Sequence, residues 1–334
     1  MNKKLLALLL AILMVAMSAV AMAATQTTLN DITKIYTTDT VLPVETLTFT
    51  ATAQSAVKAD GTSVTQNIGA PTLTGSIATS AMNADATVTG KYTATVSISS
   101  DATWPFAGTY TYSVSEDAGN IQGVTYAGNS IAFKVLVGYK EVDGNPSQTL
   151  EAQDIQLVAV DGKKEGSFTN TYESGSVTVT KTVSGNAAST TDTFNVDVTF
   201  TVASNNVFSQ NVKIEGITNQ SMSEDKKTIT GTITVKHGDA ITLSNIPVGT
   251  KVTVAENDTK VNAPEDTDAT KYTATYSGNG AVVSSAAQTI AITNSRTSSI
   301  DTGVTTDSMP YILLMAFVAI LAVAFVAKKR SVKE

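Results

Sequence analysis

Short runs in which apolar and polar residues alternate recur along the middle of the chain, between clusters of Gly, Asn and Asp. Side chains two positions apart on a strand point to the same face, so this alternation predicts strands that each bury one face. No run keeps a convincing helical period for more than two turns. The pattern therefore predicts an all-β fold built from β-sandwiches.

Both ends of the chain break this alternation. At the N-terminus two lysines precede an apolar run that closes on small residues, which is the order of a secretory signal peptide, so we expect cleavage after Ala23. A retained membrane anchor is the alternative for residues 1–23. The uncharged run 311–327 precedes a basic cluster, and at about 1.5 Å per residue it crosses most of a ~30 Å hydrocarbon core. We expect a transmembrane segment with a cytoplasmic basic tail rather than a buried core helix.

One order of polar residues occurs twice between these ends: a strand with Lys, later a strand ending in Glu, and finally a strand ending in Asn. The first copy is Lys34, Glu116 and Asn170, and the second is Lys181, Glu256 and Asn294. Each of these residues continues the apolar face of its strand, as Lys34 does between Ile32 and Tyr36. A single such residue is more often at a strand end, with its head group in water. Because all six polar residues continue the apolar face of their strands, in the same order twice, we expect their side chains to be buried.

Burial of these three groups together has a chemical consequence. Loss of water disfavours an ammonium ion, so a buried lysine tends toward the neutral amine, which is a nucleophile. A nearby Glu can polarise the Asn carboxamide and carry the proton that lets ammonia leave. Because the fold supplies the proximity, worth roughly 10⁵ M in effective concentration, the expected product is a Lys–Asn isopeptide bond.

Composition narrows the function further. The chain has no Cys, a net charge of −7 and a pI near 4.8, so we expect neither disulfides nor a nucleic-acid partner. The single histidine, His237, lies in a turn-like sequence, and the acidic run 264–270 lacks the spacing of a calcium loop. We therefore expect no metal and no cofactor, and no enzyme activity beyond single-turnover bond formation.

The segments that carry the six residues resemble the streptococcal pilin isopeptide-linkage domain family, the major (shaft) pilins of sortase-assembled Gram-positive pili. The resemblance covers nearly all of the region between the two ends and is strongest at 108–117, 177–185 and 246–258. It implies two tandem immunoglobulin-like β-sandwich domains, 24–174 and 175–297, followed by a sorting tail at 298–334. It also implies bonds Lys34–Asn170 and Lys181–Asn294, assisted by Glu116 and Glu256.

The resemblance further implies assembly by a pilin-class sortase. The matching place for cleavage is SIDTG, between Thr302 and Gly303, although Ser299 and Ile300 stand where the LPxTG motif has Leu and Pro. This departure leaves the class of sortase open. The acceptor lysine of the next subunit would be Lys163 or Lys164, in the stretch that precedes Asn170.

These inferences predict a structural subunit of a cell-surface pilus, covalently polymerised and wall-anchored by sortase, with isopeptide bonds that give mechanical and proteolytic stability. The expected partners are a pilin-class sortase, further copies of this chain, peptidoglycan or a basal pilin, and a host surface through a tip subunit. The main alternative is an unpolymerised wall-anchored adhesin with the same sandwiches, which would need no lysine at 163–164. An enzyme built on a sandwich is a third reading, with no open polar cluster to support it.

Overall fold

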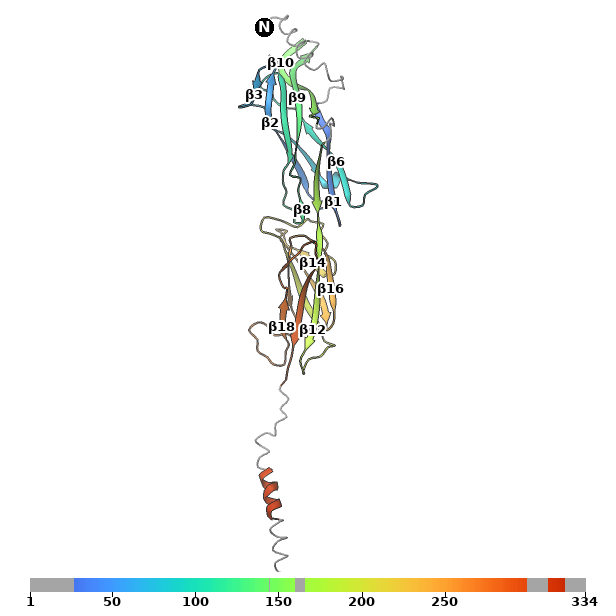
Figure 1. Cartoon of the computed structure of the whole chain (residues 1–334), viewed down its shortest axis with the longest axis vertical. Helices are drawn as coiled ribbons and strands as arrows, with labels where there is room; N and C mark the ends of the chain where they lie inside the picture. The colour runs from blue at the N-terminus through green and yellow to red at the C-terminus, as the bar shows by residue number, and fades with distance from the viewer. Residues whose placement is uncertain (1–26, 144, 160–165, 299–311, 322–334) are drawn as a thin grey trace, which may run out of the picture.

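The computed structural model describes residues 27–143, 145–159, 166–298 and 312–321 and shows two β-domains stacked end to end (Figure 1). The predicted all-β architecture is confirmed. Within these residues every regular element is a strand except the 3₁₀ turn η1 (Thr79–Ala81) and a helical segment at 312–321. None of the helices described is long and apolar enough to cross a bilayer. The expected signal peptide, 1–23, lies outside the described residues. Of the expected transmembrane segment, 311–327, the structure describes only the helical residues 312–321.

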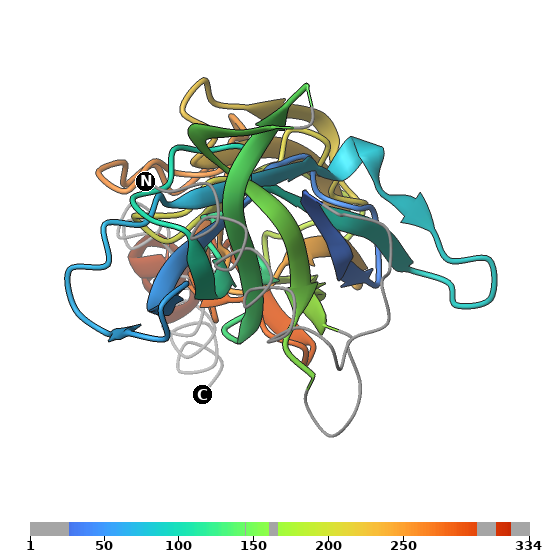
Figure 2. The same ribbon diagram turned by 90° about the horizontal axis from the view of Figure 1, so that it is seen from above.

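The first domain consists of two facing sheets. One sheet has the strand order β5 (Asn83–Ala84), β6 (Lys91–Ser99), β1 (Thr28–Thr38), β11 (Gly166–Tyr172), β8 (Val124–Thr125). The other has the order β10 (Asn145–Leu157), β9 (Ser130–Val142), β7 (Gly108–Glu116), β2 (Thr46–Lys58), β3 (Ser63–Val64), with β4 (Leu73–Ala78) also paired to β2. The β5–β6 hairpin projects sideways from this domain (Figures 1 and 2).

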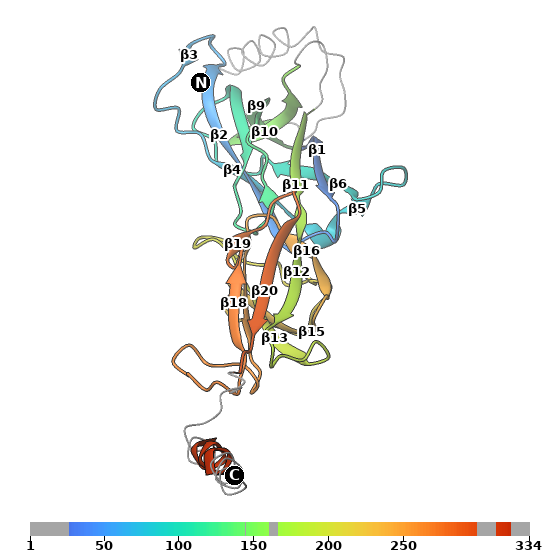
Figure 3. The same ribbon diagram turned by 60° about the horizontal axis from the view of Figure 1, so that its bottom comes forward.

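The second domain repeats the two-layer plan. Its first sheet has the order β16 (Ala240–Pro247), β12 (Ser174–Ser184), β20 (Gln288–Ser295), β18 (Thr273–Ser277), seen face-on in Figure 3. Its second sheet has the order β14 (Thr218–Met222), β15 (Thr228–Lys236), β13 (Thr193–Thr201), β17 (Lys251–Glu256), β19 (Ala281–Val282).

Each core lies between the two sheets of its domain, where the alternating apolar residues meet. On β7, Tyr110, Tyr112 and Val114 are fully buried, while the residues between them are partly exposed. Phe49 on one sheet meets Phe168 on the other with ring centroids 5.3 Å apart. Full burial of a side chain of this size stabilises the fold by about 1.5–3 kcal/mol. The period of two in the sequence thus becomes the two-layer packing.

The first and last strands of each domain are parallel neighbours. In the first domain β1 pairs with β11, so that Tyr36 stands opposite Asn170. In the second domain β12 pairs with β20, so that Val183 stands opposite Asn294. The lysine of each copy lies two positions before the residue that faces the asparagine. Both domains therefore place Lys and Asn on one buried face with the same offset.

The two domains are joined by a continuous strand path and by a hydrogen-bonded junction. β11 ends at Tyr172 and β12 begins at Ser174, so the last strand of one domain runs into the first strand of the next (Figure 3). Beside this crossing, the buried side chain of Gln122 donates to the carbonyl of Val248 (2.6 Å) and accepts from the backbone N–H of Ala203 (3.2 Å). A side chain of the first domain is thus held by two loops of the second.

Candidate functional site

Three polar side chains predicted from the first copy meet inside the first domain. Lys34 on β1 donates from Nζ to Oε2 of Glu116 at 2.5 Å, and Asn170 on β11 donates from Nδ2 to Oε1 of the same carboxylate at 2.6 Å. Lys34 and Asn170 come from adjacent strands of one sheet, while Glu116 is the last residue of β7 on the facing sheet. One carboxylate therefore bridges the amine and the carboxamide.

The environment of this group is dry, as the sequence pattern predicts. The side chains of Lys34 and Glu116 are both 0% exposed, and Asn170 is fully buried. Burial lowers the pKa of Lys34, although the hydrogen bond and charge of Glu116 oppose this shift. The lowered pKa favours the neutral amine, which is the form that can attack a carbonyl carbon.

The carboxamide of Asn170 is held at both of its polar atoms. Its Oδ1 accepts a hydrogen bond from the backbone N–H of Ala127 at 2.9 Å, while its Nδ2 is bound to Glu116. Ala127 lies in the loop between β8 and β9. The plane of the carboxamide is fixed by these two contacts on opposite atoms.

A second, half-buried carboxylate lies beside this site. Glu45 accepts hydrogen bonds from the hydroxyl of Tyr36 on Oε1 (2.9 Å) and from that of Tyr126 on Oε2 (2.7 Å). Burial raises the pKa of Glu45, and it also raises the pKa of both tyrosines. Because Tyr36 shares β1 with Lys34 and Tyr126 precedes Ala127, this cluster connects two parts of the reacting group.

The second domain contains the corresponding group with looser contacts. Lys181 donates from Nζ to Oε1 of Glu256 at 2.5 Å, and Asn294 donates from Nδ2 to the same oxygen at 3.3 Å. The side chains of Lys181 and Glu256 are 0% exposed, and burial lowers the pKa of Lys181. Among the described residues, Oε2 of Glu256 and Oδ1 of Asn294 are buried with no hydrogen-bond partner.

An aromatic ring contacts the lysine in each group. Nζ of Lys181 lies 4.4 Å from the ring centroid of Phe194, and Nζ of Lys34 lies 6.0 Å from that of Tyr36. A ring face at this range stabilises an ammonium ion while it remains charged, and its bulk keeps water from the amine. Each lysine therefore faces a carboxylate on one side and an apolar wall on another.

The structure buries the side chains of the six predicted polar residues and groups them three by three. Glu116 and Glu256 end their strands as expected, whereas β11 and β20 continue beyond Asn170 and Asn294. The other predicted positions, Lys163, Lys164, Thr302 and Gly303, lie outside the described residues.

Sequence reasoning missed Ala127, Glu45 and Tyr126. A backbone N–H carries no side-chain signature, so nothing in the sequence could mark Ala127. The one available signal was Glu45, a carboxylate placed directly before the apolar alternation of β2, where a solvated residue would be the ordinary reading.

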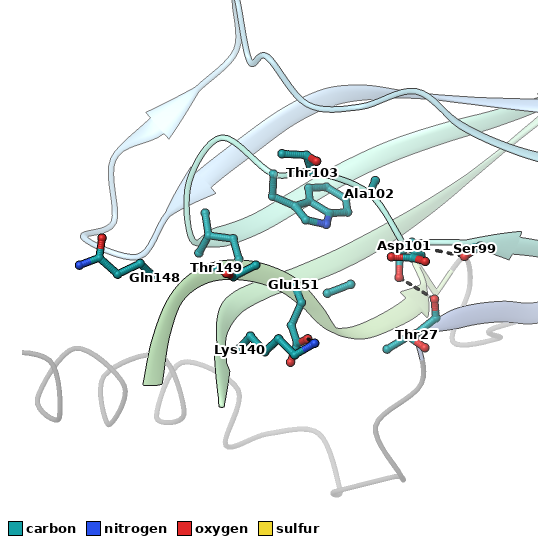
Figure 4. A pocket seen from close by; sticks show the side chains of 13 residues that line it. Thr27, Ser99, Asp101, Ala102, Thr103, Lys140, Gln148, Thr149 and Glu151 are labelled. Atoms are coloured by element: carbon teal, nitrogen blue, oxygen red, sulfur yellow. Dashed lines mark hydrogen bonds and ion pairs between the residues drawn. The ribbon is translucent and has the colours of Figure 1, made fainter. Parts of the chain in front are cut away.

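The remaining polar hollow of note lies at the end of the first domain away from the second. Figure 4 shows Thr27 and Asp101 across from Lys140 and Glu151. Nζ of Lys140 lies 3.9 Å from Oε2 of Glu151. Trp104 also lines it and packs on Tyr110 with ring centroids 4.9 Å apart. Lys140 and Glu151 are well exposed, so this hollow lacks the dry character of the two buried groups.

Comparison with known proteins finds one family match in each half of the chain. Residues 30–173 match the family described as Spy0128-like isopeptide containing domain, and residues 175–296 match a domain of unknown function (DUF7601). A pilin of Streptococcus pyogenes serotype M1 is 29% identical over 227 residues, which cover 63% of this chain and 64% of that protein.

Solved structures show the same fold. The crystal structure of the major pilin from Streptococcus pyogenes aligns with a TM-score of 0.52 at 22% identity, covering 82% of this chain and 100% of that one. The major pilin T3.2 of the same species aligns with a TM-score of 0.50 at 23% identity, covering 81% of this chain and 100% of that one. At these identities the structural likeness concerns the fold.

Proposed function

We propose that this chain, whose first domain matches the Spy0128-like isopeptide containing domain, is a pilin of the streptococcal type and forms the covalent shaft of a sortase-assembled pilus. Proteins of this family are structural subunits rather than enzymes. In this proposal each immunoglobulin-like domain, 24–174 and 175–297, closes one internal isopeptide bond, Lys34–Asn170 and Lys181–Asn294.

The observation that carries this proposal is the double occurrence of a buried Lys–Glu–Asn group with the same offset between the Lys and Asn strands. A buried ion pair is weakly stabilising at best, because two charges lose their water. Two copies with the same strand offset are therefore better explained by chemistry than by stability. The family match of the first domain supports the same reading.

The reaction follows from the contacts. Nζ of Lys34 passes a proton to Glu116 and attacks Cγ of Asn170 as a neutral amine. Glu116 gives this proton to Nδ2 and takes a second proton from Nζ. The Cγ–Nδ2 bond breaks, and ammonia picks up the second proton and leaves as ammonium while the new amide forms. Lys181, Glu256 and Asn294 do the same in the second domain, and each bond releases one ammonia.

The intact mass of the secreted form tests the two bonds. We expect a mass lower than the sequence mass by two ammonia equivalents, with cross-linked peptides joining 34 to 170 and 181 to 294. Glu116→Ala should restore one ammonia equivalent, and Glu116→Ala with Glu256→Ala should restore both. A wild-type chain at its full sequence mass would contradict the proposal.

Polymerisation is a separate part of the proposal. A sortase would cut between Thr302 and Gly303 and join Thr302 to Lys163 or Lys164 of the next subunit, and the last subunit would pass to peptidoglycan or a basal pilin. This places the protein at the cell surface, in a pilus anchored to the wall. A tip subunit would make any contact with a host surface. The similarity to a pilin over most of its length supports this part.

Substitution of the two loop lysines separates a shaft subunit from an unpolymerised adhesin. Lys163→Ala with Lys164→Ala should abolish the high-mass ladder on a denaturing gel of wall extracts while leaving both internal bonds. Each single variant identifies the acceptor. Lys140→Ala, an exposed lysine in the same domain, is the matched control. A chain that stays monomeric on the wall in the wild type would favour the adhesin.

A further inference from the structure

The two buried groups differ in one respect that bears on how fast each can react. In the first domain the Oδ1 atom of Asn170 accepts a backbone hydrogen bond from Ala127 at 2.9 Å. In the second domain Oδ1 of Asn294 has no hydrogen-bond partner among the described residues. This oxygen is the atom on which negative charge develops when an amine adds to the carboxamide carbon.

We propose that the backbone N–H of Ala127 is the oxyanion donor for the first-domain bond, and that the second domain reacts without such a donor. The inference rests on the proposed isopeptide reaction and adds a group that contacts the reacting atoms. Addition of Nζ of Lys34 to Cγ turns the C=O of Asn170 into a C–O⁻ that the N–H already faces. When the Cγ–Nδ2 bond breaks, the electron pair on Oδ1 re-forms the C=O bond. The leaving nitrogen, protonated by Glu116, departs as ammonia.

The topology explains why only one domain has this donor. β8 pairs with β11 through Val124 and Thr125 only, and the chain then leaves the sheet directly beside Asn170. The N–H of Ala127, two residues beyond Thr125, lies outside the strand ladder and donates to the side chain of Asn170 instead. In the second domain β18 stays in the ladder along β20, with Ala274 opposite Asn294. A continuous ladder leaves no loop there to turn an N–H inward.

The cluster of Glu45, Tyr36 and Tyr126 holds the donor in place. The side chain of Tyr126, next to Ala127, donates to Glu45 at 2.7 Å and accepts from the backbone N–H of Ile121 at 3.2 Å. Glu45 is held in turn by Tyr36, the neighbour of Lys34 on the buried face of β1. Tyr126 is therefore a positioning residue: it fixes the loop so that the N–H points at Oδ1 before any charge develops.

The contacts of the two carboxylates show the same difference between the first and second domains. Glu116 binds the amine with one oxygen and Nδ2 of Asn170 with the other, at 2.5 and 2.6 Å. Glu256 uses one oxygen for both partners, at 2.5 and 3.3 Å. The first site thus has the amine, the leaving nitrogen and the oxyanion each held by a separate atom, while the second relies on a single carboxylate oxygen.

Removal of the N–H alone tests the proposal. Ala127→Pro deletes the donor, and replacement of Ala127 by lactic acid through nonsense suppression exchanges the N–H for an ester oxygen at almost unchanged shape. Ala127→Ser keeps the N–H and is the control. Each secreted-form chain is recovered unfolded in urea, diluted to start folding, and sampled over time for intact mass and for the two cross-linked peptides.

Loss of one oxyanion donor typically slows a reaction by 10²–10³, so we expect the 34–170 bond to form about 100-fold more slowly in the proline and ester chains. The 181–294 bond in the same molecules should keep its wild-type rate and serves as an internal control. Should the proline ring prevent folding, the ester chain decides. A wild-type rate for the 34–170 bond in the ester chain overturns the proposal.

A positioning role for Tyr126 is tested in the same assay. Tyr126→Phe should slow the 34–170 bond several-fold, whereas Tyr110→Phe, which removes a buried hydroxyl bound to the carbonyl of Phe106 at 2.7 Å, should not. Equal rates in the two variants would leave Tyr126 with a structural role only and overturn its assignment. If the wild-type chain loses no ammonia at all, the isopeptide reaction itself fails, which is a different outcome from an unslowed variant.

Discussion

The second-domain bond should raise the stability of that domain by an amount that chain entropy sets. Asn294→Ala removes the carboxamide and with it the cross-link between β12 and β20. The bond closes a loop between positions 181 and 294. By analogy with a disulfide, a cross-link over about 110 residues lowers the entropy of the unfolded chain, which raises the free energy of unfolding by about 5 kcal/mol. In the unreacted chain the side-chain hydrogen bond of Asn294, at 3.3 Å, is made by the nitrogen that leaves as ammonia, so the cross-link dominates the expected loss.

Differential scanning calorimetry measures this loss. For a domain of this size about 5 kcal/mol corresponds to a fall in melting temperature of about 15–20 °C. Glu256→Gln keeps the volume of the site while removing the acid–base group, so it should lose the bond without opening a cavity and should show a similar fall. The first domain should melt unchanged in both variants.

Two outcomes would refute this reasoning. If mass spectrometry shows the bond in the wild type and Asn294→Ala still melts within a few degrees of it, the entropy of loop closure is not what the bond contributes. The second outcome is that the melting temperature of Asn294→Ala falls by much more than a few degrees, while Glu256→Gln loses the bond and keeps its melting temperature. The loss of stability would then come from packing at Asn294 rather than from the cross-link.

Two further predictions follow from the pKa of the buried lysine and from the junction. In Asn170→Ala the unreacted Lys34 keeps a lowered pKa, so between that pKa and 10.5 the unfolded chain binds a proton that the folded chain lacks. The free energy of unfolding of Asn170→Ala, compared with that of the double variant Lys34→Met and Asn170→Ala, should therefore rise with pH toward 10.5. A fall in urea titrations would contradict this. Gln122→Ala should widen the range of angles between the domains in small-angle scattering without changing either melting temperature, because it removes the hydrogen bonds to Val248 and Ala203; unchanged scattering would contradict it.

The strand faces could be predicted because a period of two determines which side chains share a surface. Lys34 and Tyr36 are two apart, so the burial of one implies the orientation of the other, and the same argument holds for Asn170 between Phe168 and Tyr172. Which sheet supplies Glu116 required the fold, since nothing local says that β7 faces β1 across the core.

The parts that escaped prediction depend on where strands stop. Ala127 acts through its backbone, and its position follows from the end of β8 after Thr125, a boundary that no residue type marks. Gln122 gains its role from loops of the other domain, more than eighty positions later in the chain. Both are products of tertiary packing, and a pattern within one strand carries no information about them.

The direct passage from β11 into β12 bears on how such a fibre would respond to pulling. With attachment at Lys163 or Lys164 and release at Thr302, as proposed, tension enters just before β11, follows β11 and β12 to Lys181, crosses to Asn294 and leaves along the tail. Most of the backbone of both domains would lie outside that route. The fibre should then be nearly inextensible, and a single-molecule experiment that severed only the 181–294 link would release the hidden length of the second domain and leave the first domain folded.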